Sequence, residues 1–130
     1  EEPYTIAMVV NEFLGSGSRI DFSILGTDIS TSILKKAVNA IYTEERVSGI
    51  PLELKRQYFL RSKDSEKQLV RIIPKIRNKV KYQRLNFMDP EYPTVPGDFD
   101  IVFCRNVLIY FDKPTQERMF PLPIQSSDCL

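Results

Sequence analysis

An aspartate that directly follows a short apolar run points most clearly to chemistry. Asp28 follows Phe22–Thr27 (FSILGT), a run typical of buried parallel strands. In doubly wound α/β sheets, ligands bind beyond the carboxyl ends of the strands, where one carboxylate accepts hydrogen bonds from ribose hydroxyls. The alternative is that Asp28 caps the helix that follows. From the residues alone the two interpretations have equal weight.

Asn86 and Phe87 close a second strand-like run, Val80–Phe87. An asparagine side chain has the donors and acceptors to bind the edge of an adenine, and an apolar neighbour contacts its ring. The alternative is ordinary turn chemistry, because Asn and Asp are common in loops before a proline such as Pro90. Judged from these residues alone, the turn is the better interpretation.

A polar group follows the most apolar of the strand-like runs, Phe99–Cys104 (FDIVFC). Arg105 is suited to hold a carboxylate through two parallel hydrogen bonds, and Tyr110 offers a hydroxyl donor nearby in the chain. The alternative makes Cys104 a small buried apolar residue and Arg105 an ion-pair partner of Asp100 or Asp112.

The residue types that are absent exclude several classes of enzyme. The 130 residues contain no histidine, which removes Ser-His and Cys-His catalysis, histidine-ligated zinc and any imidazole base. Two cysteines are too few for a disulfide framework or a four-thiolate metal site, so we expect a reducing, cytoplasmic location and no metal. No apolar run approaches the roughly 18 residues of a membrane span.

Helices and strands that alternate along the chain would position these residues. Periodicity predicts a helix over Pro3–Leu14, which ends at the glycines of GSGS, and a second helix over residues 31–41 after the FSILGT strand. Val80–Phe87 and Phe99–Cys104 are expected to continue a parallel sheet, with a final helix that begins after Asp112. The fold class predicted is α/β.

The middle of the chain departs from that pattern. Residues 58–61 and 69–73 are β-rich and flank a polar turn, so we expect an antiparallel hairpin inserted at about residues 55–75. Between Lys55 and Arg84 there are eleven Lys and Arg against two acids, a charge of +9, whereas the rest of the chain carries −8. This asymmetry indicates an acidic partner, and the alternative is a solvated face that pairs with acids of the same fold.

Three strings resemble the SAM-binding domain of CheR-type chemotaxis receptor methyltransferases. They are EEPYTIAMVVNEF, ILGTDIST followed by ILKKA, and FDIVFCRNVLIYFDKPTQER, and the resemblance runs in order from Glu1 to about Arg118. It implies a Rossmann-like sheet that binds S-adenosylmethionine (SAM). The implied reaction is methylation of glutamate side chains on the acidic cytoplasmic bundle of chemoreceptors, with S-adenosylhomocysteine as the second product.

The resemblance also implies a role for each matching residue. The residues carried over as cofactor contacts are Glu2, Asp28, Asn86, Phe87, Cys104 and Arg105. Arg105 and Tyr110 are carried over as the residues that meet the substrate carboxylate. No general base is needed, because a glutamate carboxylate is already a nucleophile at neutral pH and in-line positioning supplies much of the rate enhancement.

The chain also departs from the family pattern. The first strand and its glycine turn do not precede Glu1, and residues 119–130 look like a divergent tail, so we expect residues 1–118 to be a partial domain. A sheet without its central strand exposes unpaired backbone. We therefore expect these 130 residues alone to pair or strand-swap as a homodimer, and to bind SAM and turn over poorly.

Two other functions fit parts of the pattern. A non-catalytic module would use the basic segment to bind receptor tails or another acidic partner. Nucleic-acid binding fits the charge, but the chain has no recognition motif and few aromatic residues lie among the bases.

Overall fold

The computed structural model describes residues 1–15, 17–89 and 99–119 in two units, Glu1–Asn86 and a second that begins at Phe87. The helices are α1 (Glu2–Leu14), α2 (Thr31–Asn39), α3 (Leu52–Tyr58), α4 (Pro74–Arg77) and α5 (Lys113–Met119). The strands are β1 (Ile24–Asp28), β2 (Ile41–Thr43), β3 (Phe59–Arg61), β4 (Leu69–Ile72) and β5 (Val80–Arg84). Two 3₁₀ turns complete the set, η1 (Ser65–Lys67) and η2 (Leu108–Tyr110).

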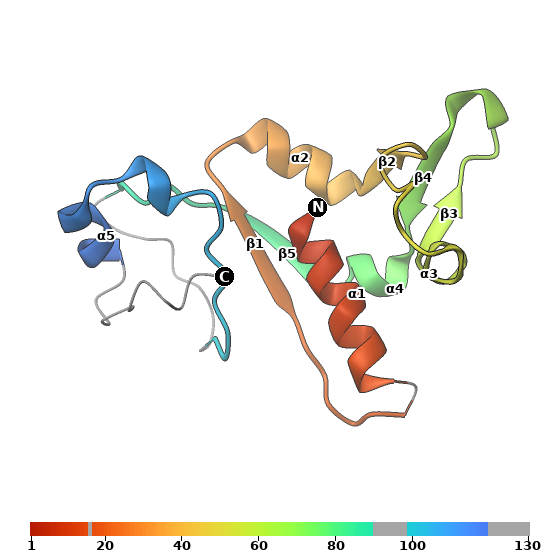
Figure 1. Ribbon diagram of the computed structural model, residues 1–130, viewed down its shortest axis with the longest axis horizontal. Coiled ribbons are helices and arrows are strands. Elements are labelled where there is room, and N and C mark those ends of the chain that lie inside the picture. The colour runs from red at the N-terminus through yellow and green to blue at the C-terminus, as the bar shows by residue number, and fades with distance from the viewer. Residues whose placement is uncertain (16, 90–98, 120–130) are drawn as a thin grey trace. The chain divides into compact units, whose positions relative to one another are not determined.

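A parallel pair of strands, β1 and β5, forms the first sheet (Figure 1). Their register joins Ile24 to Val80 and Asp28 to Arg84, so the carboxyl ends of both strands lie at one edge. Parallel strands need a long crossover, and here the crossover contains α2, the second sheet and α4. The predicted strands at FSILGT and after Val80 are confirmed within two or three residues.

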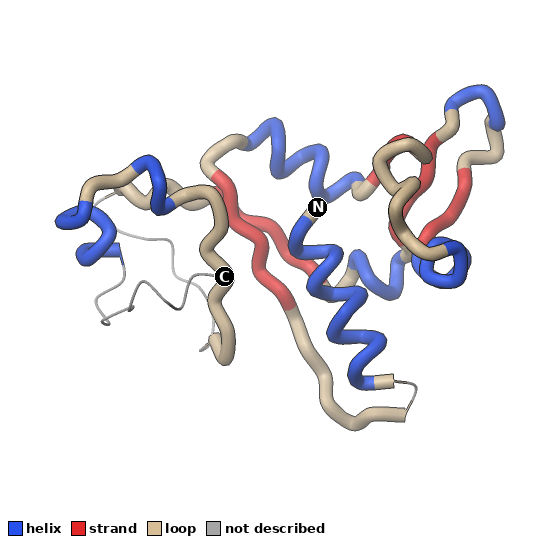
Figure 2. The backbone as a smooth tube through the Cα atoms, in the orientation of Figure 1, coloured by secondary structure: helices blue, strands red, loops and turns tan. Residues whose placement is uncertain are grey.

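The second sheet is antiparallel, in the order β2–β4–β3 (Figure 2). It confirms the predicted hairpin, with Phe59 opposite Ile72 and Arg61 opposite Val70. Sequence reasoning missed β2 and α4, because three or four residues carry too little periodicity to reveal an element.

The core of the first unit lies where α1 meets both sheets. Tyr4, Ala7, Tyr58, Ile72 and Ile76 are all at most 2% exposed. Tyr4 packs edge-to-face on Tyr82, with 5.8 Å between the ring centroids, and its hydroxyl donates to the Ala37 carbonyl of α2 at 2.9 Å. Burial raises the pKa of both tyrosines. α1 therefore joins β5 to α2.

The other end of α1 is tied to the antiparallel sheet. The Tyr58 hydroxyl accepts a hydrogen bond from Asn11 Nδ2 at 2.7 Å and donates to the Glu12 carboxylate. Gln57 Nε2 donates to the same carboxylate at 2.6 Å. Since Tyr58 ends α3 and precedes β3, these bonds fix α1 against the inserted sheet.

The expectation of a buried strand over Phe99–Cys104 is wrong. Residues 99–105 form neither helix nor strand, and Ile101, Val102 and Phe103 are 70%, 66% and 64% exposed. An apolar run becomes a strand only beside a neighbour that completes its hydrogen bonds. Among the described residues the parallel sheet consists of β1 and β5, and neither strand pairs with this run.

Two other expectations have different outcomes. The final helix is confirmed as α5, and Asp112 caps it by accepting a hydrogen bond from the Thr115 amide at 3.1 Å. Of the predicted tail at residues 119–130, all but Met119 lies outside the described residues, as does the segment from Pro90 to residue 98.

Gly26 of β1 lies so close to Tyr82 and Pro3 that a side chain would have little room. A Cβ on this residue would lie 2.7 Å from Tyr82 Cε1 and 3.1 Å from Pro3 Cγ. We predict that Gly26→Ala destabilises the fold by about 1–3 kcal/mol, because the Tyr82 ring is held by Tyr4 and cannot yield freely. Urea unfolding measures the change.

The matched control is Gly49→Ala, where nothing lies within 4 Å of the added carbon. This variant is expected to be neutral or slightly more stable, because alanine restricts the unfolded chain. Equal unfolding midpoints for the two variants would show that the contact at Gly26 has no energetic importance.

Candidate cofactor and substrate site

Asp28 is the last residue of β1, at the carboxyl edge of the parallel pair. Its Oδ1 accepts a hydrogen bond from the Ser30 amide at 2.7 Å, which fixes the carboxylate in a tight turn. The N-cap of α2 is Ser30, whose hydroxyl accepts from the Ile33 amide, so Asp28 is not the cap. Within the described ranges, Oδ2 of Asp28 has no hydrogen-bond partner.

The end of β5 brings Asn86 to the same edge. Asp28 lies opposite Arg84 in the register, and the Leu85 amide donates to the Asp28 carbonyl at 3.1 Å. Asn86 is the next residue and is half-buried. Two candidate residues separated by 58 positions in sequence therefore lie on adjacent strand ends.

Glu2 is in the first turn of α1, where its negative charge is favourable at the positive end of the helix dipole. The neighbouring Pro3 contacts the position of Gly26 in β1, two residues before Asp28. The packing of α1 on β1 therefore places the start of this helix beside the strand that carries Asp28.

The remaining candidates belong to the second unit. Phe87 begins a turn, Cys104 is half-buried and in no disulfide, and Arg105 is exposed. Arg105 makes no ion pair with Asp100 or Asp112 in the part of the chain that the structure describes, so the structural alternative for this residue is wrong. Tyr110 ends η2 and is 79% exposed. A common cleft for Asp28 and Arg105 stays a prediction.

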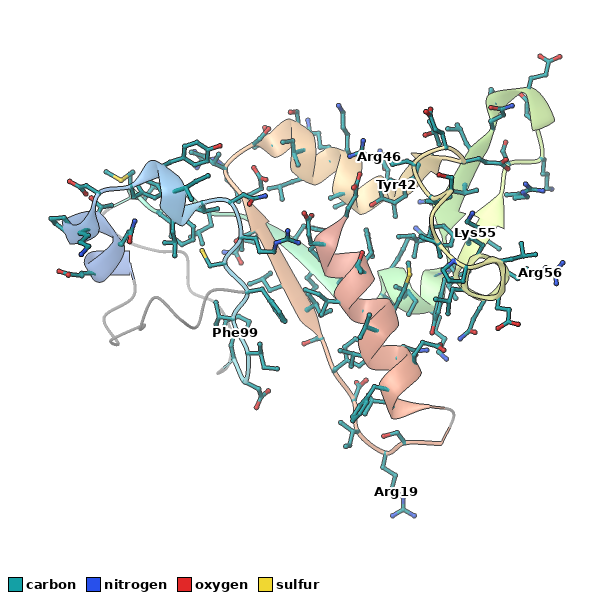
Figure 3. All side chains as sticks on the ribbon, in the orientation of Figure 1. Arg19, Tyr42, Arg46, Lys55, Arg56 and Phe99 are labelled. Carbon is teal, nitrogen blue, oxygen red and sulfur yellow. The ribbon has the colours of Figure 1, made fainter. Side chains whose placement is uncertain are left out.

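A cavity of about 120 Å³ lies between α1, the antiparallel sheet and the turn after β2, and its described lining includes none of the candidate residues. Tyr42 and Arg46, both labelled in Figure 3, belong to its wall. Burial raises the pKa of Tyr42 to about 12, and Arg46 contacts the Glu1 carboxylate. The rest of the wall is mostly apolar, and the cavity is smaller than the roughly 300–1,000 Å³ of sites that bind drug-sized ligands.

Sequence reasoning gave no site role to two residues that bond to the segments carrying the candidates. The Ser30 amide donates to the Asp28 carboxylate and so orients it. Gln116 was given no role, although its amide bonds to the turn that carries Tyr110. The signal for Gln116 is its position four residues after the cap Asp112, which turns it back toward η2.

The described residues show neither a metal-binding group nor a membrane-spanning helix. No three His, Cys, Asp or Glu side chains among them form a group suited to a metal ion, and the metal-free site stays a prediction. None of the helices among residues 1–15, 17–89 and 99–119 combines the length and apolarity needed to cross a membrane.

Comparison with known proteins identifies the family. Residues 1–121 match the family described as CheR methyltransferase, SAM binding domain. The chemotaxis protein methyltransferase of Klebsiella aerogenes is 42% identical over 120 residues, covering 92% of this chain and 40% of the relative. The chemotaxis protein methyltransferase of Borreliella burgdorferi is 41% identical over 121 residues, covering 92% of this chain and 41% of the relative.

A third relative has a name that refers to biofilm formation. The probable biofilm formation methyltransferase WspC of Pseudomonas putida is 37% identical over 121 residues, covering 92% of this chain and 27% of the relative. The chain thus spans about two fifths of the length of the chemotaxis relatives named above.

These matches confirm the family and the fold class predicted from the sequence. The parallel pair β1–β5 and the antiparallel sheet agree with a Rossmann-like methyltransferase fold. The chain belongs to the CheR methyltransferase family, through the SAM-binding domain that gives the family its description.

Proposed function

We propose that the protein carrying this chain methylates glutamate side chains of chemoreceptors in the cytoplasm, with SAM as methyl donor. The observation that supports it most is the placement of Asp28 and Asn86 on adjacent carboxyl ends of parallel strands, in a chain of the CheR family. This is the edge at which doubly wound sheets bind nucleotide-like ligands. The relatives whose names refer to chemotaxis point to receptors as substrates.

The residues at this edge fit the adenosyl half of SAM. Asp28 offers Oδ2 to ribose hydroxyls while Oδ1 stays bonded to the Ser30 amide. Asn86 offers an amide to the adenine edge, and Phe87 offers an apolar ring beside it. Glu2, at the start of α1, is assigned to the polar end of the cofactor.

The reaction asks for orientation more than for acid–base catalysis. SAM, when bound, supplies a methyl group activated by a sulfonium. Arg105 holds the substrate carboxylate so that one oxygen points along the reaction axis, and Tyr110 donates a hydrogen bond to it. The carboxylate oxygen gains the methyl group as the carbon–sulfur bond breaks, and no proton has to move. The absence of histidine in the sequence agrees with this chemistry.

The basic segment Lys55–Arg84 supports an acidic substrate surface. Of its eleven bases, Arg61, Lys67 and Lys79 pair with acids of the described residues. The exposed bases Arg56, Lys63, Lys75, Lys81 and Arg84 make no such ion pair. We assign this surface to the encounter with the acidic receptor bundle, an effect that weakens as salt increases.

A cofactor-binding test centres on Asp28. In the whole protein, Asp28→Asn is expected to weaken S-adenosylhomocysteine binding about 10- to 100-fold in calorimetry, because asparagine keeps the bond to Ser30 but loses the charge that binds the ribose.

The matched control is Asp64→Asn, since Asp64 makes the same kind of bond to the amide of Glu66 at 3.2 Å. Its affinity is expected to be unchanged. Equal affinities for wild type and Asp28→Asn would remove Asp28 from the site.

A turnover test centres on Arg105. We expect Arg105→Lys to lower kcat for methyl transfer to a purified chemoreceptor cytoplasmic fragment by about 10- to 100-fold. Lysine keeps the charge but cannot form the two parallel bonds that orient a carboxylate. Incorporation of labelled methyl groups measures kcat.

Arg19→Lys is the control, because Arg19 is an exposed arginine in the turn after α1 (Figure 3). If Arg105→Lys kept full kcat, the assignment of Arg105 to the substrate carboxylate would be wrong.

The role of the basic segment is tested by neutralising Arg56, Lys63 and Lys75 to glutamine together. The affinity for the same receptor fragment is expected to fall roughly tenfold at low salt and less at high salt, as long-range attraction is screened. Neutralising Lys35, Lys36 and Lys113 removes the same charge outside the segment. Equal losses in the two triple variants would contradict a localised surface. Receptor binding without any SAM binding would favour the non-catalytic module instead.

A further inference from the structure

The turn that carries Tyr110 has little regular structure of its own. It begins at Asn106, whose φ of 56° lies in the left-handed region that asparagine tolerates. Two backbone bonds close η2, from the Tyr110 amide to the Val107 carbonyl and from the Phe111 amide to the Leu108 carbonyl, both at 3.1 Å. A single 3₁₀ turn of this kind has weak hydrogen-bond geometry and needs support from outside.

The side chain of Gln116 supplies that support. Its Nε2 donates to the Leu108 carbonyl and to the Phe111 carbonyl, each at 2.9 Å. Because both acceptors are carbonyl oxygens, only the NH₂ end of the amide fits here, and its two hydrogens match two acceptors. The Gln116 side chain is half-buried, which strengthens these bonds relative to bonds in open water.

The position of Gln116 follows from the start of α5. Asp112 caps this helix through the Thr115 amide, and the Gln116 amide donates to the Asp112 carbonyl at 3.0 Å. The first turn of α5 is therefore well formed, and it presents Gln116 to η2. The side chain of Gln116 therefore joins α5 to η2.

Tyr110 depends on this support more than most side chains would. It is 79% exposed, and its hydroxyl has no hydrogen-bond partner in the part of the chain that the structure describes. Since neither packing nor a side-chain hydrogen bond fixes the Tyr110 ring, the position of the ring follows from the conformation of its backbone. The two carbonyls bound by Gln116 stand on either side of Tyr110 in the chain.

We propose that Gln116 is a positioning residue for methyl transfer: its amide clamps the two carbonyls that flank Tyr110 and so fixes where the tyrosine hydroxyl meets the substrate. This inference rests on the proposed function, which assigns Tyr110 to the substrate carboxylate. Small displacements of a positioned group are costly in rate, so loss of the clamp lowers kcat.

The test replaces Gln116 by methionine in the whole protein. Methionine has a similar length and no N–H donors, so both bonds are lost while the space stays filled. We expect kcat for methylation of a chemoreceptor cytoplasmic fragment to fall about tenfold, with the KM for SAM unchanged within about twofold. Faster hydrogen exchange at the Phe111 amide is expected to report the looser turn, since this amide closes η2.

Two companion variants separate positioning from simple stability. Gln116→Lys restores N–H donors of similar reach and is expected to recover part of kcat. Glu117→Gln changes the adjacent exposed residue of α5 and is expected to leave kcat and exchange unchanged.

The outcomes distinguish this inference from the proposed function. Two results for Gln116→Met would overturn the positioning role. One is an unchanged kcat together with faster hydrogen exchange, and the other is a loss of SAM affinity equal to the loss of kcat. Either result would leave the proposed function intact. No methyl transfer by the wild-type protein would overturn the proposed function, and this inference with it.

Discussion

The close approach at Gly26 is the constraint on which the rest of the first unit depends. Only a residue without a side chain lets the Tyr82 ring and Pro3 lie against the middle of β1. That contact places α1 on the parallel pair, in a register where Asp28 and the end of β5 share one edge. Packing inside the first unit therefore positions Asp28 and the end of β5, which are candidates of that unit only.

α1 connects the parallel pair of strands to the antiparallel sheet within the first unit. At one end, Tyr4 packs on Tyr82 and bonds to α2, and at the other, Asn11 and Glu12 bond to Tyr58. A helix of 13 residues spans about 20 Å, so α1 links the inserted sheet to the strand that carries Asp28. The bases of the insertion, which we propose face the receptor, therefore belong to the same unit as Asp28.

In the second unit, side-chain hydrogen bonds to a turn, and not core packing, support the segment that carries Tyr110. Arg105 and Tyr110 are exposed. Tyr110 ends the 3₁₀ turn η2, which the side chain of Gln116 supports from α5, the helix that Asp112 caps, whereas Arg105 precedes that turn. Side-chain bonds to a backbone turn are weaker than core packing, but they act locally and need no neighbouring strand. This agrees with the finding that the turn is well formed although the preceding run Phe99–Cys104 is not a strand.

The sequence by itself determined the elements whose signals are local. The helix before GSGS, the FSILGT strand, the hairpin and the capped helix after Asp112 could all be predicted, and the string around CRNVLIYF identified the family. Asp28 and Arg105 were candidates for the same reason, because each follows an apolar run. Only the tertiary structure decided which partners these signals meet. It showed that Ser30 and not Asp28 caps α2, that Gln116 supports Tyr110, and that FDIVFC stays exposed. Hydrophobicity is a property of the run itself, whereas a strand or a clamp exists only when a second segment supplies the matching hydrogen bonds.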